Sequence, residues 1–389
     1  MNISIIGPSK RFFSGISAYT ICLANALSRD NDVSALLLRK LLPQFLYPGK
    51  GQIGRIDHSL QFTPGIISFD GMDWNSPFSW LKAYRFLRQQ KPQVIIMQWW
   101  TSSVVHMQLF LALVNRLRIK AGLILEMHEV VDPLEESILP IRLYSRIMGR
   151  LLMRRADAFV VHASSVKDQV TRIYGLKEDR VFVIPHALYD VYYQNCDKQV
   201  ARDDLGISEE FVILYFGLIR KYKGVPCLVE AFNKLPPDIA LHSRLVIAGE
   251  DWGDETSLDD MVDSSPYKEQ ITYKPQFVPE EMIPKYFSAA DVVVLPYLRT
   301  AGSGVANIAM AYGRPLIISD LEVLRESFIH YKGAMFTPIG DSAAIAERLM
   351  QIYSEHKSGK PLIYKSPRNT WDEIARQYEQ IMAQFNTGS

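Results

Sequence analysis

Short apolar runs alternate with amphipathic stretches along most of the chain. Runs of strand length occur in two series, at residues 3–6, 33–38, 94–97, 123–127, 158–161 and 181–184, and then at residues 211–216, 245–248, 271–273, 292–295, 316–318 and 334–336. Helical patterns separate the runs within each series. Because strands that alternate with helices form parallel sheets, the sequence predicts an α/β protein with two doubly wound domains.

The two series meet near residue 190, where Pro185-His186-Ala187 ends the first one and a polar, linker-like stretch follows at 194–202. We predict an N-terminal domain over residues 1–190 and a C-terminal domain over residues 200–370. Residues 371–385 have the pattern of an amphipathic helix, and we expect the segment 371–389 to pack back on the first domain. Two such domains in tandem predict an interdomain cleft, because doubly wound sheets bind ligands at the carboxyl ends of their strands.

The composition is that of a soluble globular protein, with 48% apolar and 22% charged residues in a chain of 389. The three cysteines have no disulfide or metal-ligand spacing, which indicates a reducing compartment. The chain begins directly with a strand pattern and shows no secretory signal. Its longest apolar stretch, 104–114, is much shorter than the roughly 20 residues that span a bilayer. We therefore expect a cytoplasmic protein that reaches a membrane only peripherally.

Charge is distributed unevenly between the two halves. Residues 1–190 hold 23 lysines and arginines against 15 acidic residues, whereas the remainder holds 20 against 27. The acidic half argues against nucleic-acid binding over the whole surface. The basic half fits an anionic substrate or an anionic membrane face.

Two strand-to-helix loops carry the strongest chemical signal. One follows the run 211–216 and contains Arg220 and Lys223; the other follows the run 292–295 and contains Gly302-Ser303-Gly304 at a helix start. Two cations on one side and helix-terminal amides on the other are suited to holding a diphosphate. A solvated surface turn is the alternative for Arg220 and Lys223, and the position after a strand favours the binding role.

Other residues at strand ends are weaker candidates. His128 follows the run 123–127, and a structural histidine is as common in this position as one that contacts a ligand. Gly15, before the first helix, permits close approach of an acceptor or forms a plain turn. Trp99 and Trp100 follow the run 94–97 and are either a sugar-stacking platform or ordinary core aromatics.

Three further patterns bear on cofactors and on membrane contact. The first loop lacks the G-x-G-x-x-G spacing of dinucleotide-binding enzymes. Asp30-Asn31-Asp32 resembles the acidic motif of metal-dependent sugar transferases but lies away from the expected cleft, so no metal or other cofactor is predicted.

Residues 141–155 form a basic amphipathic helix with Arg142, Arg146, Arg150 and Arg154 spaced four apart. That helix fits anionic lipid headgroups or a solvated face.

These motifs resemble the retaining glycosyltransferases of family four, or group 1, which have two Rossmann-like domains in the GT-B architecture. The resemblance is strongest in the second half, in the segments 214–224, 245–249, 286–297 and 309–317. In the first half it is looser and rests on Gly15, on His128, and on the segments 155–157 and 183–185. Together these segments cover most of the chain in the expected order.

The resemblance implies roles for individual residues. Arg220 and Lys223 would hold the donor diphosphate, and Phe277 with Val278 would hold the nucleotide base through backbone groups. Gly302, Ser303 and Gly304 would cradle phosphate and sugar, and His128 would approach the sugar. Such enzymes resemble one another in needing no metal, because cations and helix dipoles neutralise the departing diphosphate.

The chain departs from the family pattern at two positions. The family usually has two glutamates eight positions apart, and these positions fall on Thr300 and Ile308 here. Thr300 then occupies the catalytic position beside the sugar. Isoleucine cannot bond a ribose, so main-chain groups or an acid such as Glu326 would hold the nucleotide. Leu218 replaces a common arginine, and Arg220 would act from two residues further on.

The leading hypothesis is a retaining glycosyltransferase that moves a sugar from a nucleoside diphosphate donor to a lipid-linked or glycan acceptor. It would act in cell-surface polysaccharide or glycolipid synthesis at the inner membrane face. The alternative is a non-catalytic GT-B module that binds a nucleotide sugar and assists a partner enzyme. A nucleotide-sugar epimerase would need paired carboxylates, and the sequence offers no convincing pair.

Overall fold

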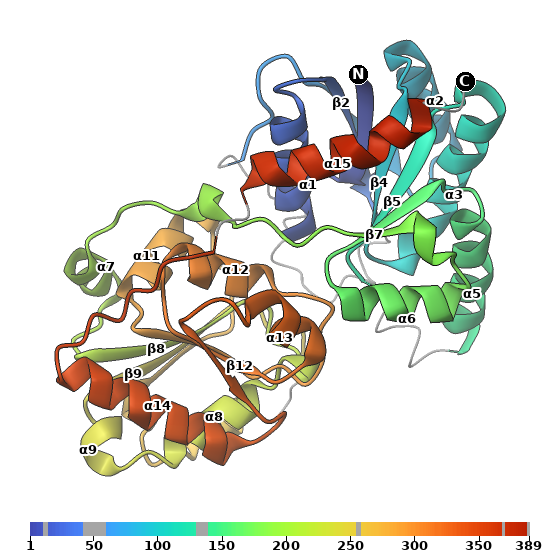
Figure 1. The fold of residues 1–389 in the computed structure, drawn as a ribbon. Helices are drawn as coiled ribbons and strands as arrows, with labels where there is room; N and C mark the ends of the chain where they lie inside the picture. Colours follow the sequence, from blue (N-terminus) through green and yellow to red (C-terminus); the bar gives the residue numbers. More distant parts are fainter. Residues whose placement is uncertain (11–14, 42–59, 130–138, 254–257, 368–369, 387–389) are drawn as a thin grey trace. The chain divides into compact units, whose positions relative to one another are not determined.

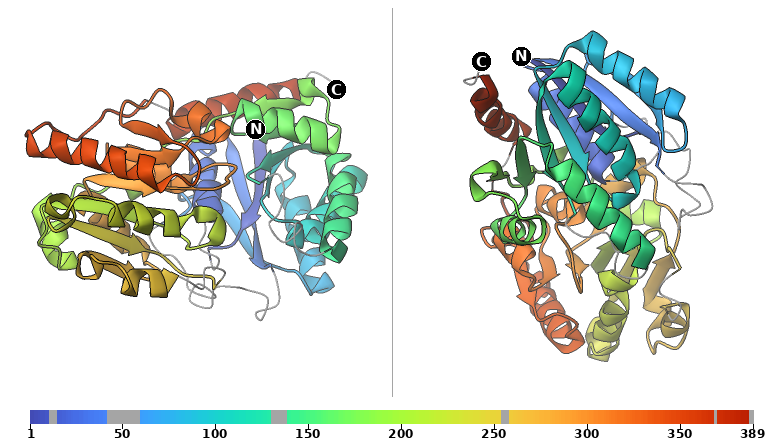
Figure 2. Two further views of the ribbon diagram at one scale, coloured as in Figure 1. Left: turned by 90° about the horizontal axis from the view of Figure 1, so that it is seen from below. Right: turned by 90° about the vertical axis from the view of Figure 1, so that its right-hand side faces the viewer.

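All twelve apolar runs predicted as strands form strands, and the predicted α/β fold with two parallel sheets is confirmed. The computed structural model describes residues 1–10, 15–41, 60–129, 139–253, 258–367 and 370–386. These residues form two units, which we call unit 1 (1–187 with 370–386) and unit 2 (188–367). Each unit has one sheet with helices on both of its faces (Figure 1 and Figure 2).

The sheet of unit 1 has seven parallel strands in the order β3-β2-β1-β4-β5-β6-β7. Its strands are β1 (Asn2–Pro8), β2 (Asp32–Lys40), β3 (Ile67–Asp73), β4 (Val94–Trp99), β5 (Gly122–Met127), β6 (Ala158–Val161) and β7 (Val181–Val183). Its α-helices are α1 (Gly15–Leu27), α2 (Pro77–Gln90), α3 (Val105–Val114), α5 (Leu139–Met153), α6 (Ser164–Tyr174) and α15 (Trp371–Asn386). Short helical turns lie at Ser102–Val104, Asn115–Ile119 and Glu178–Arg180.

The sheet of unit 2 has six parallel strands in the order β10-β9-β8-β11-β12-β13. Its strands are β8 (Phe211–Phe216), β9 (Ser243–Ala248), β10 (Ile271–Lys274), β11 (Val292–Leu295), β12 (Leu316–Ser319) and β13 (Ala334–Thr337). Its α-helices are α7 (Lys198–Leu205), α8 (Val225–Asn233), α9 (Pro237–Ala240), α10 (Leu258–Asp263), α11 (Ile283–Ala289), α12 (Gly304–Ala311), α13 (Glu322–Phe328) and α14 (Ser342–Lys357). Short helical turns lie at Asp190–Tyr192, Lys221–Lys223, Lys268–Gln270 and Glu280–Met282.

Strand β3 is the one strand of the described chain that the apolar pattern did not predict. It lies at the edge of its sheet, and most of its residues are exposed or half-buried. Its register with β2 shifts between Leu37 and Leu38 and again before Lys40. An edge strand does not need apolar residues on both faces, so it leaves no continuous apolar run in the sequence.

The predicted amphipathic helix at the C-terminus is present as α15 and packs on unit 1. Its apolar face is buried; this face consists of Ile374, Ala375, Tyr378, Ile381 and Met382. The ring of Trp371 lies 5.0 Å from the ring of Tyr19 on α1. Asn31 donates to Glu379 over 2.8 Å and accepts from the amino group of Met1 over 3.1 Å. Asn31 of the Asp30-Asn31-Asp32 motif, directly before β2, therefore links Met1 and α15 by hydrogen bonds.

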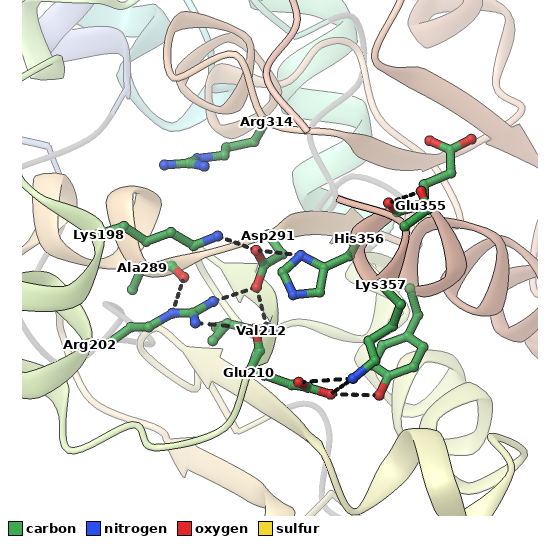
Figure 3. A network of polar contacts seen from close by, with 12 residues as sticks. Lys198, Arg202, Glu210, Val212, Ala289, Asp291, Arg314, Glu355, His356 and Lys357 are labelled. Atoms are coloured by element: carbon green, nitrogen blue, oxygen red, sulfur yellow. Dashed lines mark hydrogen bonds and ion pairs between the residues drawn. The ribbon is translucent and has the colours of Figure 1, made fainter. Parts of the chain in front are cut away.

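A buried carboxylate anchors the amino-terminal edge of the unit 2 sheet. Asp291, directly before β11, is 1% exposed and accepts from the amide of Val212 over 2.7 Å. It also pairs with Arg202 over 2.5 Å and with Lys198, both on α7 (Figure 3). A cavity of about 560 Å³ borders Lys198, Asp291 and Arg314. This cluster lies at the opposite ends of β8 and β11 from the loops described below.

No helix within the described ranges is both long enough and apolar enough to cross a lipid bilayer.

Candidate functional site

The two loops that the sequence singled out contact each other at the carboxyl edge of the unit 2 sheet. They follow the neighbouring strands β8 and β11, and the amide of Leu298 donates to the carbonyl of Tyr222 over 2.8 Å. Gly224 has a φ of +66°, and a Cβ there would lie 2.1 Å from the carbonyl oxygen of Pro296. Because only glycine fits this contact, Gly224 permits the two loops to close on each other.

Aromatic faces hold the two cations of the first loop. The Nζ of Lys223 lies 3.8 Å from the ring centroid of Tyr297, and the Cζ of Arg220 lies 5.0 Å from the ring centroid of Trp252. Tyr297 is 1% exposed, and its hydroxyl lies 3.3 Å from the Oγ of Ser303. A cation over an aromatic face is attracted to the ring and restricted in direction. Lys223 is thereby held close to the start of α12.

The second loop ends in a capped helix start. Ser303 is the N-cap of α12, and its Oγ accepts from the amide of Ala306 over 3.2 Å. In the described part of the chain, no acceptor contacts the amides of Gly304 and Val305. These two amides and the helix dipole are what α12 offers to an anion. The hydroxyl of Ser303 is used in this cap, and the donor-binding roles of Gly302, Ser303 and Gly304 stay predictions.

The two positions where the family has glutamates carry no carboxylate, and both side chains have structural contacts. The hydroxyl of Thr300 bonds the carbonyl of Gly302 and accepts from the amide of Gly302 over 3.2 Å, so it closes the loop before α12. Ile308 is 6% exposed and belongs to the core. The catalytic role predicted for Thr300 stays a prediction.

The remaining donor-side predictions also stay predictions. Phe277 and Val278 are half-buried in the loop that follows β10. Glu326 lies on the exposed side of α13. Each of the three is in unit 2, together with the two loops.

Two residues of this region, Glu250 and Trp252, were not predicted from the sequence. Trp252, which stacks on Arg220, donates from Nε1 to the carboxylate of Glu250 over 3.2 Å. Glu250 is 8% exposed, and its carbonyl accepts from the amide of Ile219 over 2.9 Å. Both follow the Ala-Gly that ends β9, so their position after a strand was the available signal.

Three histidines gather at the carboxyl edge of the unit 1 sheet. His128 follows β5, His162 follows β6, and His186 follows β7. The ring centroid of Tyr19 lies 5.0 to 5.5 Å from the ring centroids of all three. His162 is buried, whereas His128 and His186 are half-buried. The single histidine that the sequence singled out is therefore one of a group.

Both ring nitrogens of His128 are engaged within unit 1. Its Nε2 contacts the amide oxygen of Gln98, and its Nδ1 lies 3.3 Å from the Nε2 of His162. The Nδ1 of His162 lies 3.0 Å from the carbonyl oxygen of Ile184. Burial lowers the pKa of His128 well below its ordinary value and lowers the pKa of His162 to about 4, so both rings are neutral. The role of His128 beside a sugar stays a prediction, and in this arrangement no ring nitrogen is left for it.

The ligand atoms of the three histidines lie within 4.8 Å of one another, which is the spacing of a metal site. The rings of His162 and His186 are tilted against each other, with centroids 3.9 Å apart and planes inclined by 31°. All four ring nitrogens of His128 and His162 contact each other, Gln98 or Ile184, whereas a zinc site requires one nitrogen of each ring to point at the ion. The geometry therefore favours a hydrogen-bonded cluster.

The acceptor-side predictions have different outcomes. Trp99 is 3% exposed, and its ring lies 3.6 Å from the Cβ position of Gly149 on α5, so it is a core aromatic and has no free face for a sugar. This corrects the platform role for Trp99. Trp100 is half-buried, and Gly15 opens α1 with no described atom within 4 Å of its Cβ position. Their acceptor-side roles stay predictions.

Comparison with known proteins gives consistent matches for both units. Residues 13–188 match the model of Glycosyltransferase Family 4, and residues 197–376 match that of Glycosyl transferases group 1. A D-inositol 3-phosphate glycosyltransferase of Pseudarthrobacter chlorophenolicus is 26% identical over 229 residues, which cover 57% of this chain and 54% of that protein. The chain thus spans about half the length of the curated relatives that it matches.

Solved structures resemble the whole chain. Sucrose-phosphate synthase from Thermosynechococcus elongatus has a TM-score of 0.73 at 17% identity, with 100% of this chain and 99% of that chain covered. HepE of Anabaena, solved in complex with UDP and glucose, has a TM-score of 0.69 at 15% identity, with full coverage of both chains. At these identities the likeness shows a shared GT-B fold.

Proposed function

Since the chain belongs to the family 4, group 1 glycosyltransferases, we propose that it transfers a sugar from a nucleoside diphosphate donor to a lipid-linked or glycan acceptor, with retention of configuration. The observation that carries the proposal is the chain of contacts from Lys223 through Tyr297 to Ser303 at the start of α12. It brings a cation and helix-terminal amides to one strand edge, as a diphosphate requires. The UDP complex of HepE, which has the same fold, supports a nucleotide donor.

The proposed mechanism uses the chain's own groups to stabilise the leaving diphosphate. The bond between the anomeric carbon and the diphosphate oxygen breaks, and Lys223, Arg220 and the amides at the start of α12 stabilise the departing anion. The acceptor oxygen bonds the anomeric carbon from the same face, and its proton passes to the departing phosphate oxygen. This route requires neither a carboxylate at Thr300 or Ile308 nor a metal ion, and we propose that no cofactor is needed.

The second candidate is a nucleotide-sugar-binding module without turnover. It is favoured by one observation, that Thr300 closes a turn and Ile308 is buried where the family has two glutamates. Both candidates predict nucleotide binding, so they differ only in whether a sugar is transferred or released.

Thermal unfolding with a panel of nucleoside diphosphates and nucleotide sugars, in the absence of metal, tests the donor site. A ligand at 100 times its Kd adds about 2.7 kcal/mol to the free energy of unfolding. We expect one nucleotide to raise the Tm selectively, and Lys223→Ala to lose most of that rise. If no nucleotide raises the Tm, the donor site is wrong.

We further propose that α5 docks unit 1 on anionic lipid at the cytoplasmic membrane face, where a lipid-linked acceptor for polysaccharide or glycolipid synthesis would lie. Leu143 and Ile147 are 60% and 51% exposed on this helix, beside the exposed Arg146 and Arg150. The opposite side of the helix packs on the unit through Ser145, Leu152 and Met153, and through Gly149 against Trp99. Exposed apolar residues next to arginines are typical of helices that lie on anionic membranes.

Sedimentation with phosphatidylglycerol vesicles tests this docking surface. We expect the protein to bind these vesicles but not phosphatidylcholine vesicles, and to lose binding when Leu143 and Ile147 are both changed to glutamine. Leu241→Gln is the matched control, because Leu241 is 54% exposed on unit 2. Equal binding by the double variant and the control would exclude α5 as the contact.

A further inference from the structure

A buried carboxyl group lies beneath His128 in unit 1. Glu126 on β5 is 0% exposed, and its Oε2 accepts from the side-chain amide of Gln98 over 2.5 Å. The hydroxyls of Tyr19 and Tyr378 lie close to it, and the Nε2 of His162 lies 3.7 Å from its Oε1. Within the described ranges no lysine or arginine pairs with it. Glu126 is therefore surrounded by neutral polar groups.

When Glu126 is ionised, the hydrogen bonds above it conflict. The carboxylate only accepts, so Gln98 offers it the NH2 group and accepts from the Nε2 of His128 with its amide oxygen. A neutral His128 that donates from Nε2 has no proton on Nδ1. The Nε2 of His162 also carries no proton, because the proton of this neutral ring is on Nδ1, which donates to the carbonyl of Ile184. Two lone pairs then face each other over 3.3 Å, which is repulsive.

When Glu126 is protonated, every contact has one donor and one acceptor. The carboxyl O–H donates to the amide oxygen of Gln98, and the reversed amide donates from its NH2 group to the Nε2 of His128. His128 then carries its proton on Nδ1 and donates to the Nε2 of His162. The proton on Glu126 thus decides, through the side-chain amide of Gln98, which nitrogen of His128 carries a proton.

We infer that Glu126, acting through Gln98, is a positioning residue for His128: protonated Glu126 locks the His128 ring against His162, and ionised Glu126 releases it. The proton that Glu126 loses passes to solvent. The catalytic consequence rests on the proposed function, because a released ring is the one that can turn a nitrogen toward a ligand beyond β5.

The sign of the pH dependence follows from the burial of each group. Burial raises the pKa of Glu126 to about 7, and the hydroxyls of Tyr378 and Tyr19 oppose that rise. Burial and the neighbouring histidines keep the pKa values of His128 and His186 low, so these rings do not take up the proton. His128 is therefore locked below a pH of about 7 and released above it.

Histidine side-chain nitrogen NMR on the full chain tests this inference without any substrate. The Nδ1 and Nε2 signals of His128 are assigned by their loss in His128→Asn. As the pH rises, we expect the Nδ1 signal to change from the protonated to the unprotonated shift and the Nε2 signal to change in the opposite sense, with a midpoint near pH 7. Glu126→Gln, whose amide donates as the protonated acid does, should keep His128 locked at every pH. Tyr378→Phe removes a hydroxyl that favours the ionised form, so its midpoint should shift upward.

Three results would overturn the inference. These are a His128 signal that does not change with pH, a charged His128–His162 pair throughout, and a metal ion bound by these histidines in the purified protein. Glu178→Gln, an exposed acid of unit 1, is the matched control and should behave as the wild type does.

An activity profile tests the catalytic consequence separately. In the wild type, kcat/KM should rise about tenfold per pH unit below the midpoint, and this rise should be absent in Glu126→Gln. If the NMR exchange is seen and no nucleotide binds, the network stands and the proposed function fails. If nucleotide binds and the NMR exchange is absent, the positioning role fails alone.

Discussion

Lys223→Ala should lower kcat/KM by about 10²- to 10³-fold, the usual effect of removing one preorganised donor from a developing anion. The ammonium of Lys223 is held 3.8 Å from the Tyr297 ring centroid, beside the start of α12. Because the ring fixes its direction, little reorganisation is needed when the diphosphate departs. The measurement is sugar transfer from the nucleotide sugar identified by thermal unfolding.

Lys221→Ala is the matched control for this prediction. Lys221 is an exposed lysine in the same short helical turn, and its replacement should change kcat/KM by less than about threefold, as expected for a charge screened by solvent. Unchanged Tm values in both variants would show that unit 2 is intact. Equal loss of activity in both would mean that the turn contributes only general positive charge.

Most of the fold could be predicted because central parallel strands are buried on both faces and so leave continuous apolar runs. Strand β3 could not, since it is an edge strand with few buried residues. The meeting of the loops that contain Arg220 and Gly302 was also predictable. Neighbouring parallel strands bring the loops that follow them to the same edge, whatever the side chains are.

The candidate site in unit 1 was much less predictable. His128 could be placed at a strand end, but its partners Gln98 and His162 come from two other segments of the chain, and His162 in turn contacts Ile184 from a third. Trp99 and Trp100 are adjacent in the sequence, yet Trp99 is buried against Gly149 of α5 whereas Trp100 is half-buried. Burial of a single aromatic side chain depends on which helix crosses it, and the local pattern does not contain that information.

Asp291→Asn should destabilise unit 2 by about 3–5 kcal/mol, the usual cost of removing one partner from a buried ion pair. Asp291 is 1% exposed and compensates both Arg202 and Lys198 while accepting from the amide of Val212 (Figure 3). Asparagine keeps the shape and loses the charge, so the buried Arg202 and the half-buried Lys198 remain without an anion. Urea denaturation, followed by hydrogen exchange at the amides of β8 and β11, measures the loss.

Glu210→Gln is the matched control for Asp291→Asn, because Glu210 also pairs with a lysine, Lys357, but at the surface. Its pair spans 3.0 Å between side chains that are 38% and 53% exposed, so solvent screens the attraction. We expect a loss of less than about 1 kcal/mol in the free energy of unfolding. A loss as small in Asp291→Asn would mean that α7 is held by its apolar contacts, and that the carboxylate before β11 does not anchor this edge of the sheet.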